Sequence, residues 1–266
     1  MSKISESGHS KNVANWEQLT TTVLSFGSAY NPSRKEIQIP MVQQIGVDAK
    51  LAMGVVNVTK AEYKNASAAR ADAFEPVGPL VTRCMDAIKS TSTIYRVDDN
   101  AKTIARKIRG RRAKTKKAVD PMALTTDGKL EKEISTSQMS FDNQLANFDE
   151  LISYFESVPE YAPNEPELKT ASLRAFWNDL KAKNDRAIAA TINFGHARAK
   201  RNEILYTPIT GMVDLSVDVK TYVRSVYGIK SPEYKSLTKL SFRSIPKSTA
   251  LSSGLSITNS GSQVVL

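Results

Sequence analysis

The sequence predicts an all-α protein with two tandem duplicated helical units, each holding one long helix of about 40 residues. Three observations support this prediction. Apolar residues recur at helical spacing over long stretches, the pattern of the first half returns in the second half, and no stretch of comparable length alternates with the period of two typical of strands. We therefore expect an elongated antiparallel helical bundle.

The strongest helical pattern runs from Asn164 to Tyr206. Asn164 and Glu167 have the spacing of a capping box, in which each side chain accepts from a backbone N–H of the first turn. Pro166 is tolerated there because a first-turn residue needs no N–H donor. Pro208 supplies the stop. Between these limits an apolar stripe recurs at i, i+3, i+4 and i+7, beginning with Leu173, Phe176, Trp177 and Leu180.

A related pattern begins 131 residues earlier and predicts a first long helix from Ser33 to Phe74. Pro40 predicts a kink or a broken first turn in it, because an interior proline costs about 3 kcal/mol. The alternative is chance similarity between two Ala-rich helices, against which the paired Tyr-x-Pro motifs argue. Eight residues are identical at this shift: Tyr30, Pro32, Glu36, Asp48, Lys50, Ala66, Ala68 and Arg70 match Tyr161, Pro163, Glu167, Asp179, Lys181, Ala197, Ala199 and Arg201.

The two patterns and the composition between them predict the domain organisation. Shorter helices flank each long helix, and polar or Ser-rich stretches separate or follow the repeats. The predicted segments are a flexible N-terminal arm (1–11), helical repeat 1 (12–109), a basic and polar linker (110–139), helical repeat 2 (140–243) and a Ser-rich C-terminal tail (244–266).

Length and composition are those of an ordinary soluble protein. The chain has 266 residues, of which 41% are hydrophobic, and enough length to bury a sizeable core. No apolar run approaches the roughly 18 residues that a membrane-spanning helix needs, and the first residues carry no secretory signal. A single cysteine excludes an internal disulfide. We expect a cytoplasmic protein without a transmembrane segment, with leaderless export as the alternative.

The most unusual composition lies between the repeats. Nine of the sixteen residues in 102–117 are basic and none is acidic, so this segment carries most of the net charge of +10. One hypothesis is a phosphate-contacting arm for nucleic acid or another polyanion; the other is a solvated linker kept extended by self-repulsion. The lack of aromatic residues between Tyr95 and Phe141 argues against base stacking. The candidate polyanion-binding residues are Lys102, Arg106, Lys107, Arg109, Arg111, Arg112, Lys114, Lys116 and Lys117.

Residue types that carry catalysis are few. His9 lies in the polar arm, His196 lies on a long helix without an acidic residue one turn away, and Cys84 lies in a helical pattern typical of a buried small residue. Phosphate loops, nucleophile elbows and metal-ligand spacings are not found. We expect a protein that is not an enzyme and that needs no cofactor and no metal.

Five further stretches are distinctive: 12–19 (NVANWEQL), 30–33 (YNPS), 98–104 (DDNAKTI), 161–165 (YAPNE) and 197–206 (ARAKRNEILY). With them the chain resembles an uncharacterised all-helical protein family of Bacteroidota over about residues 10 to 243. The resemblance implies a bacterial origin, which argues against a nuclear-localisation role for the basic segment, and it transfers no functional residue.

The leading hypothesis is therefore a non-enzymatic structural or interaction protein that assembles with itself, or with another protein, through its helical faces and tails. A polyanion-binding protein that uses 102–117 is the alternative. A helical membrane-active toxin is a third hypothesis, although no apolar hairpin suited to insertion is seen.

Overall fold

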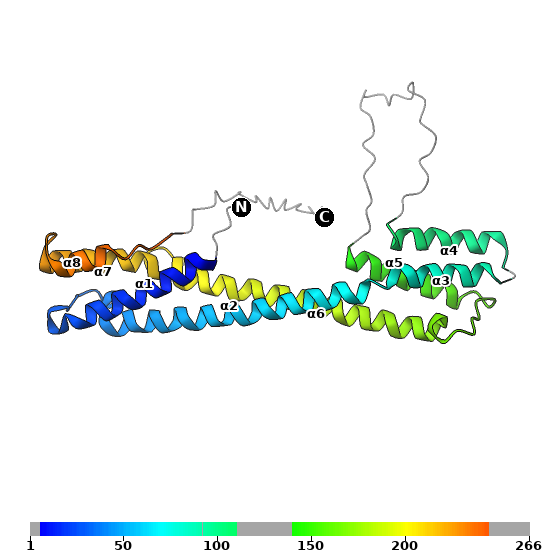
Figure 1. Ribbon diagram of the computed structural model, residues 1–266, viewed down its shortest axis with the longest axis horizontal. Coiled ribbons are helices and arrows are strands. Elements are labelled where there is room, and N and C mark those ends of the chain that lie inside the picture. Colours follow the sequence, from blue (N-terminus) through cyan, green and yellow to red (C-terminus); the bar gives the residue numbers. More distant parts are fainter. Residues whose placement is uncertain (1–5, 92, 111–139, 245–266) are drawn as a thin grey trace, which may run out of the picture. The chain divides into compact units, whose positions relative to one another are not determined.

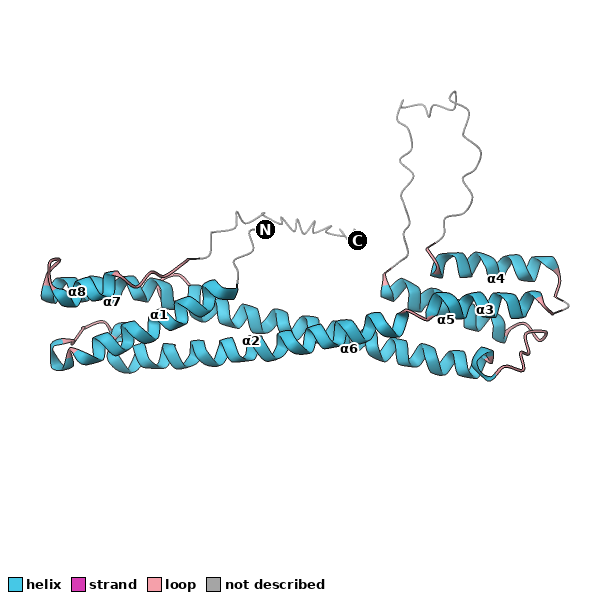
Figure 2. Ribbon diagram, viewed as in Figure 1, coloured by secondary structure: helices cyan, strands magenta, loops and turns pink. Residues whose placement is uncertain are grey.

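The computed structural model describes residues 6–91, 93–110 and 140–244, which form eight α-helices and three short 3-10 helices with no strand among them (Figure 2). The all-α prediction is therefore confirmed. In the first half, α1 (Glu6–Ser25), η1 (Gly27–Ala29), η2 (Lys35–Ile37), α2 (Ile39–Phe74), α3 (Val77–Lys89) and α4 (Tyr95–Ile108) follow one another. The second half contains α5 (Phe141–Glu156), η3 (Pro166–Leu168), α6 (Thr170–Tyr206), α7 (Met212–Tyr227) and α8 (Pro232–Thr238).

Each half contains one long helix, as predicted: α2 has 36 residues and α6 has 37. Both end where the sequence predicts, at Phe74 and Tyr206, but both begin six residues later than predicted. A short 3-10 helix precedes each of them instead. Pro40 consequently falls in the first turn of α2, where its missing N–H costs nothing. In place of the expected broken first turn, the chain forms the short helix η2, and α2 begins after it.

The chain folds as two compact units that do not coincide with the predicted repeats. Unit 1 combines the residues up to Val56 with those from Ala197 onward, and unit 2 is formed by Asn57–His196. Within each unit α2 and α6 run in opposite directions (Figure 1). The start of one long helix therefore lies beside the end of the other, and each unit draws helices from both halves of the chain.

Buried positions repeat along the two long helices at the shift of 131 seen in the sequence. Val42, Ala49 and Val56 are buried in α2, and their counterparts Leu173, Leu180 and Ala187 are buried in α6. The same holds farther along for Ala66 with Ala197 and for Phe74 with Leu205. This spacing of seven residues keeps one face of each helix inward over many turns. The duplication of the sequence is thus accompanied by a repeated burial pattern.

The core of unit 1 forms where α1, α7 and α8 pack on the ends of the long helices. Trp16 and Leu19 of α1 are fully buried, and the indole Nε1 of Trp16 donates to the carbonyl oxygen of Val42 at 2.8 Å. After α8 the chain runs back over α1 and α7. The Asn12 side chain pairs with both the N–H and the carbonyl of Arg243, at 2.9 Å each, and the ring of Phe242 packs edge-on against Trp16.

The core of unit 2 is built from α3, α4 and α5 together with the adjoining parts of α2 and α6. The apolar side of α4 contributes Ile104 and Ile108, and α5 contributes Phe148 and Phe155. Ser140 caps α5 by accepting from the Asn143 N–H at 3.2 Å. In a second cluster Ala66 packs with Ala187 and Ala190. Such small side chains allow the two long helices to approach closely.

Candidate functional site

Equivalent loops lead into the two long helices, and each is held by a buried tyrosine. The Tyr30 hydroxyl donates to the carbonyl oxygen of Ile37 at 2.7 Å, and the Tyr161 hydroxyl donates to that of Leu168 at 2.9 Å. Burial is the main cause that raises the pKa of both phenols well above the usual value. Both tyrosines therefore act as neutral donors that fix the backbone where a 3-10 helix meets a long helix.

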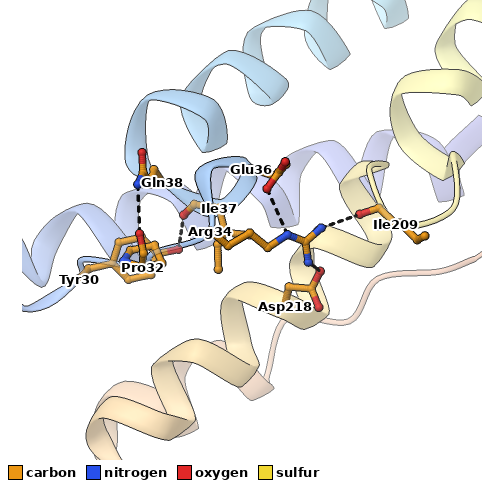
Figure 3. A network of polar contacts seen from close by, with 8 residues as sticks. All are labelled: Tyr30, Pro32, Arg34, Glu36, Ile37, Gln38, Ile209 and Asp218. Atoms are coloured by element: carbon orange, nitrogen blue, oxygen red, sulfur yellow. Dashed lines mark hydrogen bonds and ion pairs between the residues drawn. The ribbon is translucent and has the colours of Figure 1, made fainter.

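In unit 1 the space beside this loop is filled by side chains. The ring of Tyr222 from α7 packs edge-on against Tyr30, with centroids 5.2 Å apart, and its hydroxyl accepts from the Asn31 N–H at 3.1 Å. Arg34 reaches from the loop to α7, where it donates to Asp218 at 2.6 Å (Figure 3). The same guanidinium donates to the Ile209 carbonyl at 3.2 Å and to Glu36 at 3.2 Å. Loop and helix are thus joined by an aromatic pair and an ion pair.

In unit 2 the corresponding space is lined by different residues. Four buried positions of α3 fix its alignment with α7, because they coincide at a shift of 131 with four buried positions there. They are Val81, Cys84, Met85 and Ile88, which match Met212, Leu215, Ser216 and Val219. At this shift Thr91 stands in the place of Tyr222 and Ala87 in the place of Asp218. Glu165 likewise stands in the place of Arg34.

The result is a cavity of about 480 Å³ between α3 and the loop that contains Tyr161. It is lined by Thr91, Ala87 and Tyr161. The carboxylate residues Asp86 and Glu165 line it as well. Arg83 lines it too and forms an ion pair with Glu167 at 2.5 Å. The volume lies in the range of small-molecule pockets. Its charged lining residues are one arginine and two acids, and one of these acids, Glu165, stands where unit 1 has Arg34.

The Asn164–Glu167 capping box that the sequence predicts is not formed. The long helix begins at Thr170, beyond both residues, and the Glu167 carboxylate pairs with Arg83 on α3 instead. The reason lies in the loop. The Tyr161 hydroxyl donates to the carbonyl oxygen of Leu168, and Pro166–Leu168 form the 3-10 helix η3. The loop therefore serves the wall of a cavity rather than the cap of a helix.

Cys84 is buried on α3. Desolvation by its surroundings is the largest cause that raises the pKa of the thiol above its usual value. A protonated, enclosed thiol is a poor nucleophile, which agrees with a role in packing. Among the residues that the structure describes, no group of three His, Cys, Asp or Glu side chains is placed to hold a metal ion.

The basic segment is only partly within the described residues. Lys102, Arg106 and Lys107 lie on α4, and Arg109 follows its last turn. The Lys107 amine is 3.2 Å from the Glu150 carboxylate on α5, and Arg106 donates to Thr103 at 3.1 Å, whereas Lys102 is exposed. The remaining candidates, Arg111, Arg112, Lys114, Lys116 and Lys117, lie outside the described residues.

The two histidines occupy different environments. His9, which the sequence places in a polar arm, lies in the first turns of α1, is buried, and has its Nδ1 2.6 Å from the Tyr206 hydroxyl. Its partner is 197 residues away in the sequence. No local pattern could therefore have indicated this burial. His196 is exposed on α6.

One face of α2 exposes a row of apolar side chains at the helical spacing i, i+4, i+8. Val47, Leu51 and Val55 make up this outer stripe, with exposed fractions of 51%, 64% and 52%. The corresponding residues of α6 are also exposed and are Asn178, Ala182 and Arg186. The two long helices therefore share their buried faces but differ on this outer face. A position-by-position comparison of the two repeats would have revealed this stripe from the sequence.

Comparison with family models, with curated proteins and with solved structures found no match. The class of protein is thus defined by the fold itself: an all-helical chain of two compact units. Within the described residues no helix is both long enough and apolar enough to cross a bilayer. The resemblance to a family of Bacteroidota stays an expectation from the sequence.

Proposed function

We propose that this protein is a non-enzymatic interaction protein that associates with further copies of itself through the outer stripe of α2. The observation that supports the proposal is the exposure of Val47, Leu51 and Val55 on one helix face. Burying a Val or Leu side chain contributes about 1.5–3 kcal/mol relative to leaving it exposed. A row of three such residues therefore favours a helix–helix contact with a partner surface.

The second long helix provides an internal comparison. α6 has the same buried pattern but carries Asn178, Ala182 and Arg186 on the corresponding outer face. The fold thus does not require apolar residues at these positions. Their presence on α2 alone supports a use outside the monomer.

The experiment compares matched substitutions on the two long helices. Leu51→Lys places a charge in the outer stripe, and Ala182→Lys places the same charge at the corresponding position of α6. Sedimentation velocity over a range of concentrations should show equal self-association for the wild type and for Ala182→Lys, and weaker self-association for Leu51→Lys. Circular dichroism checks that both variants stay folded. A wild type that is strictly monomeric at high concentration contradicts the proposal.

Polyanion binding through 102–117 is the second candidate function. It is supported by the arrangement on α4, where Lys102 and Arg106 lie one turn apart and the last turn is basic. Lys107 is paired with Glu150 on α5. Retention on heparin and on DNA should fall steeply with salt. Replacing Arg109, Arg111, Arg112 and Lys114 by Ala should abolish that retention, and unchanged retention would exclude this function.

A further inference from the structure

The space that corresponds to the Tyr161 cavity is filled by side chains in unit 1. These side chains indicate what kind of group would fit the cavity. In unit 1 the space holds the ring of Tyr222, edge-on against Tyr30, and the guanidinium of Arg34 on Asp218. In unit 2 the shorter Thr91 replaces the ring, and the acidic Glu165 replaces the guanidinium. The complementary occupant is therefore an aromatic side chain next to a cationic one.

The charges that line the cavity favour the same occupant. Asp86 and Glu165 both line it, and Arg83, which lines it as well, is paired with Glu167. The carboxylate of Asp86 is 3.1 Å from the amine of Lys89, in an exposed pair one turn along α3. Such surface pairs contribute little stability and are readily exchanged. An arriving arginine can bind carboxylates in a bidentate manner, which a lysine cannot do.

The chain itself exposes such a pair of side chains. Tyr95 begins α4 and is 79% exposed, its neighbour Ile94 is 68% exposed, and Arg96 is exposed as well. Thr93 donates to Asp98 at 2.7 Å, which holds the turn into α4 in place. An aromatic ring on an ordered turn, with so much apolar surface in water, has the character of an interface anchor.

We propose that the cavity of one copy receives Tyr95 of a second copy, with Arg96 of that copy bound by Asp86 and Glu165. The turn that carries Tyr95 follows α3 directly, and the end of α3 lines the cavity. Donor and acceptor thus lie on the same end of unit 2, so two copies exchange the contact reciprocally about a two-fold axis. This inference rests on the proposed self-association and names a contact separate from the outer stripe of α2.

A charge exchange tests the contact. Arg96→Glu places an acid against Glu165, and Glu165→Arg places a base against Arg96, so each variant alone should lose the tyrosine contact. Mixing the two variants should restore it, because the introduced glutamate then faces the introduced arginine at one contact and the native pair remains at the other. The double variant should also restore it. Sedimentation velocity on full-length chains, with the two variants distinguished by fluorescent labels, measures the heterodimer.

Two further variants test the cavity by shape. Thr91→Tyr copies the filling of unit 1 into unit 2 and should abolish the contact without any change of charge. Tyr95→Ala should abolish it from the donor side. Ile229→Ala serves as the control, since Ile229 is an exposed apolar residue of unit 1. It should leave association unchanged.

The outcomes separate this inference from the proposed function. Weaker association in Arg96→Glu, with rescue by Glu165→Arg in the mixture, supports the tyrosine contact even if Leu51→Lys has no effect. A wild type that associates, with Leu51→Lys monomeric and with Arg96→Glu and Thr91→Tyr unchanged, overturns the tyrosine contact and leaves the outer stripe in place. A wild type that is monomeric throughout overturns both.

Discussion

At the scale of single residues, the two loop tyrosines show how one hydroxyl determines where a long helix begins. Each donates to a carbonyl seven residues later, and each stands at the same position of its half of the chain. A buried carbonyl left without its donor costs about 1–3 kcal/mol. These hydroxyls therefore help to fix the loops from which α2 and α6 start.

We predict that Tyr30→Phe and Tyr161→Phe each lower the free energy of unfolding by about 1–3 kcal/mol, because each removes the donor and keeps the ring. Urea denaturation measures the change. Tyr95→Phe is the control, since that side chain is exposed and should leave stability unchanged. Equal stability of Tyr30→Phe and the wild type would show that the hydroxyl does not hold the loop.

A second prediction concerns how stability depends on pH. The hydrogen bond from Arg174 is the first cause that lowers the pKa of Glu156. The folded state therefore holds its proton less tightly than the unfolded state does. The stabilisation is present above the ordinary carboxyl range and is lost as pH falls through the lowered pKa.

Glu156→Gln should consequently be less stable than the wild type at pH 7 and equal to it at low pH. The difference at pH 7 should be about a few tenths of a kcal/mol, because the pair is largely exposed and screened. Thermal unfolding at a series of pH values checks this. A constant difference between the two proteins at all pH values would contradict it.

At the scale of elements, the two units place an indole at different positions of the same packing layer. In unit 1 Trp16 of α1 lies over Gly46 of α2, and a methyl group at Gly46 would come within 3.2 Å of the indole. In unit 2 the counterpart of Gly46 is Trp177, whose Nε1 donates to the carbonyl of Leu145 at 3.0 Å. The indole thus comes from the short helix α1 in unit 1 and from the long helix α6 in unit 2.

Two glycines of α2 therefore give a matched pair of substitutions. Gly54→Ala adds a methyl group to open space and should raise the free energy of unfolding by about 1 kcal/mol through helix propensity. Gly46→Ala should fail to stabilise, because Trp16 is fully buried and tied to Val42 and cannot move aside. Chemical denaturation compares them. Equal stabilisation by both would mean that the indole has room to shift.

The element scale is also where the sequence is most informative. Apolar periodicity and the prolines predict the ends of α2 and α6 to the residue. The predicted starts are too early, because Asn164 and Glu167 match a capping box locally while Glu167 binds Arg83 from α3. A contact between residues distant in the sequence overrides a local motif.

At the scale of the whole molecule, the sequence predicts the helices but not their grouping into units. Asn12 and Arg243 illustrate the reason, since a pairing over 231 residues leaves no periodic trace in the sequence. The candidate site has the same limit. The basic segment stands out by composition, whereas the cavity depends on Thr91 being smaller than Tyr222, which is informative only once α3 is aligned with α7.

The pairing of Asn12 with the backbone of Arg243 also yields a prediction at this scale. Asn12→Ala leaves both backbone groups of Arg243 without their partner and should weaken unit 1 selectively. Hydrogen exchange should become faster in α1 and α7 and stay unchanged in α3 and α5. Asn15→Ala, which removes one exposed bond to Ser241, should have a smaller effect. A uniform change across both units would contradict it.

The composition of unit 1 from both ends of the chain has a consequence for synthesis. Unit 2 is continuous in sequence and is complete once His196 has left the ribosome. The partner of Asn12 is made 231 residues after it. At about 5–20 residues per second, α1 waits roughly 10 to 45 s, during which Trp16 lacks its contact with Phe242. We therefore expect chains under synthesis to pass through a stage in which unit 2 is complete and unit 1 is not.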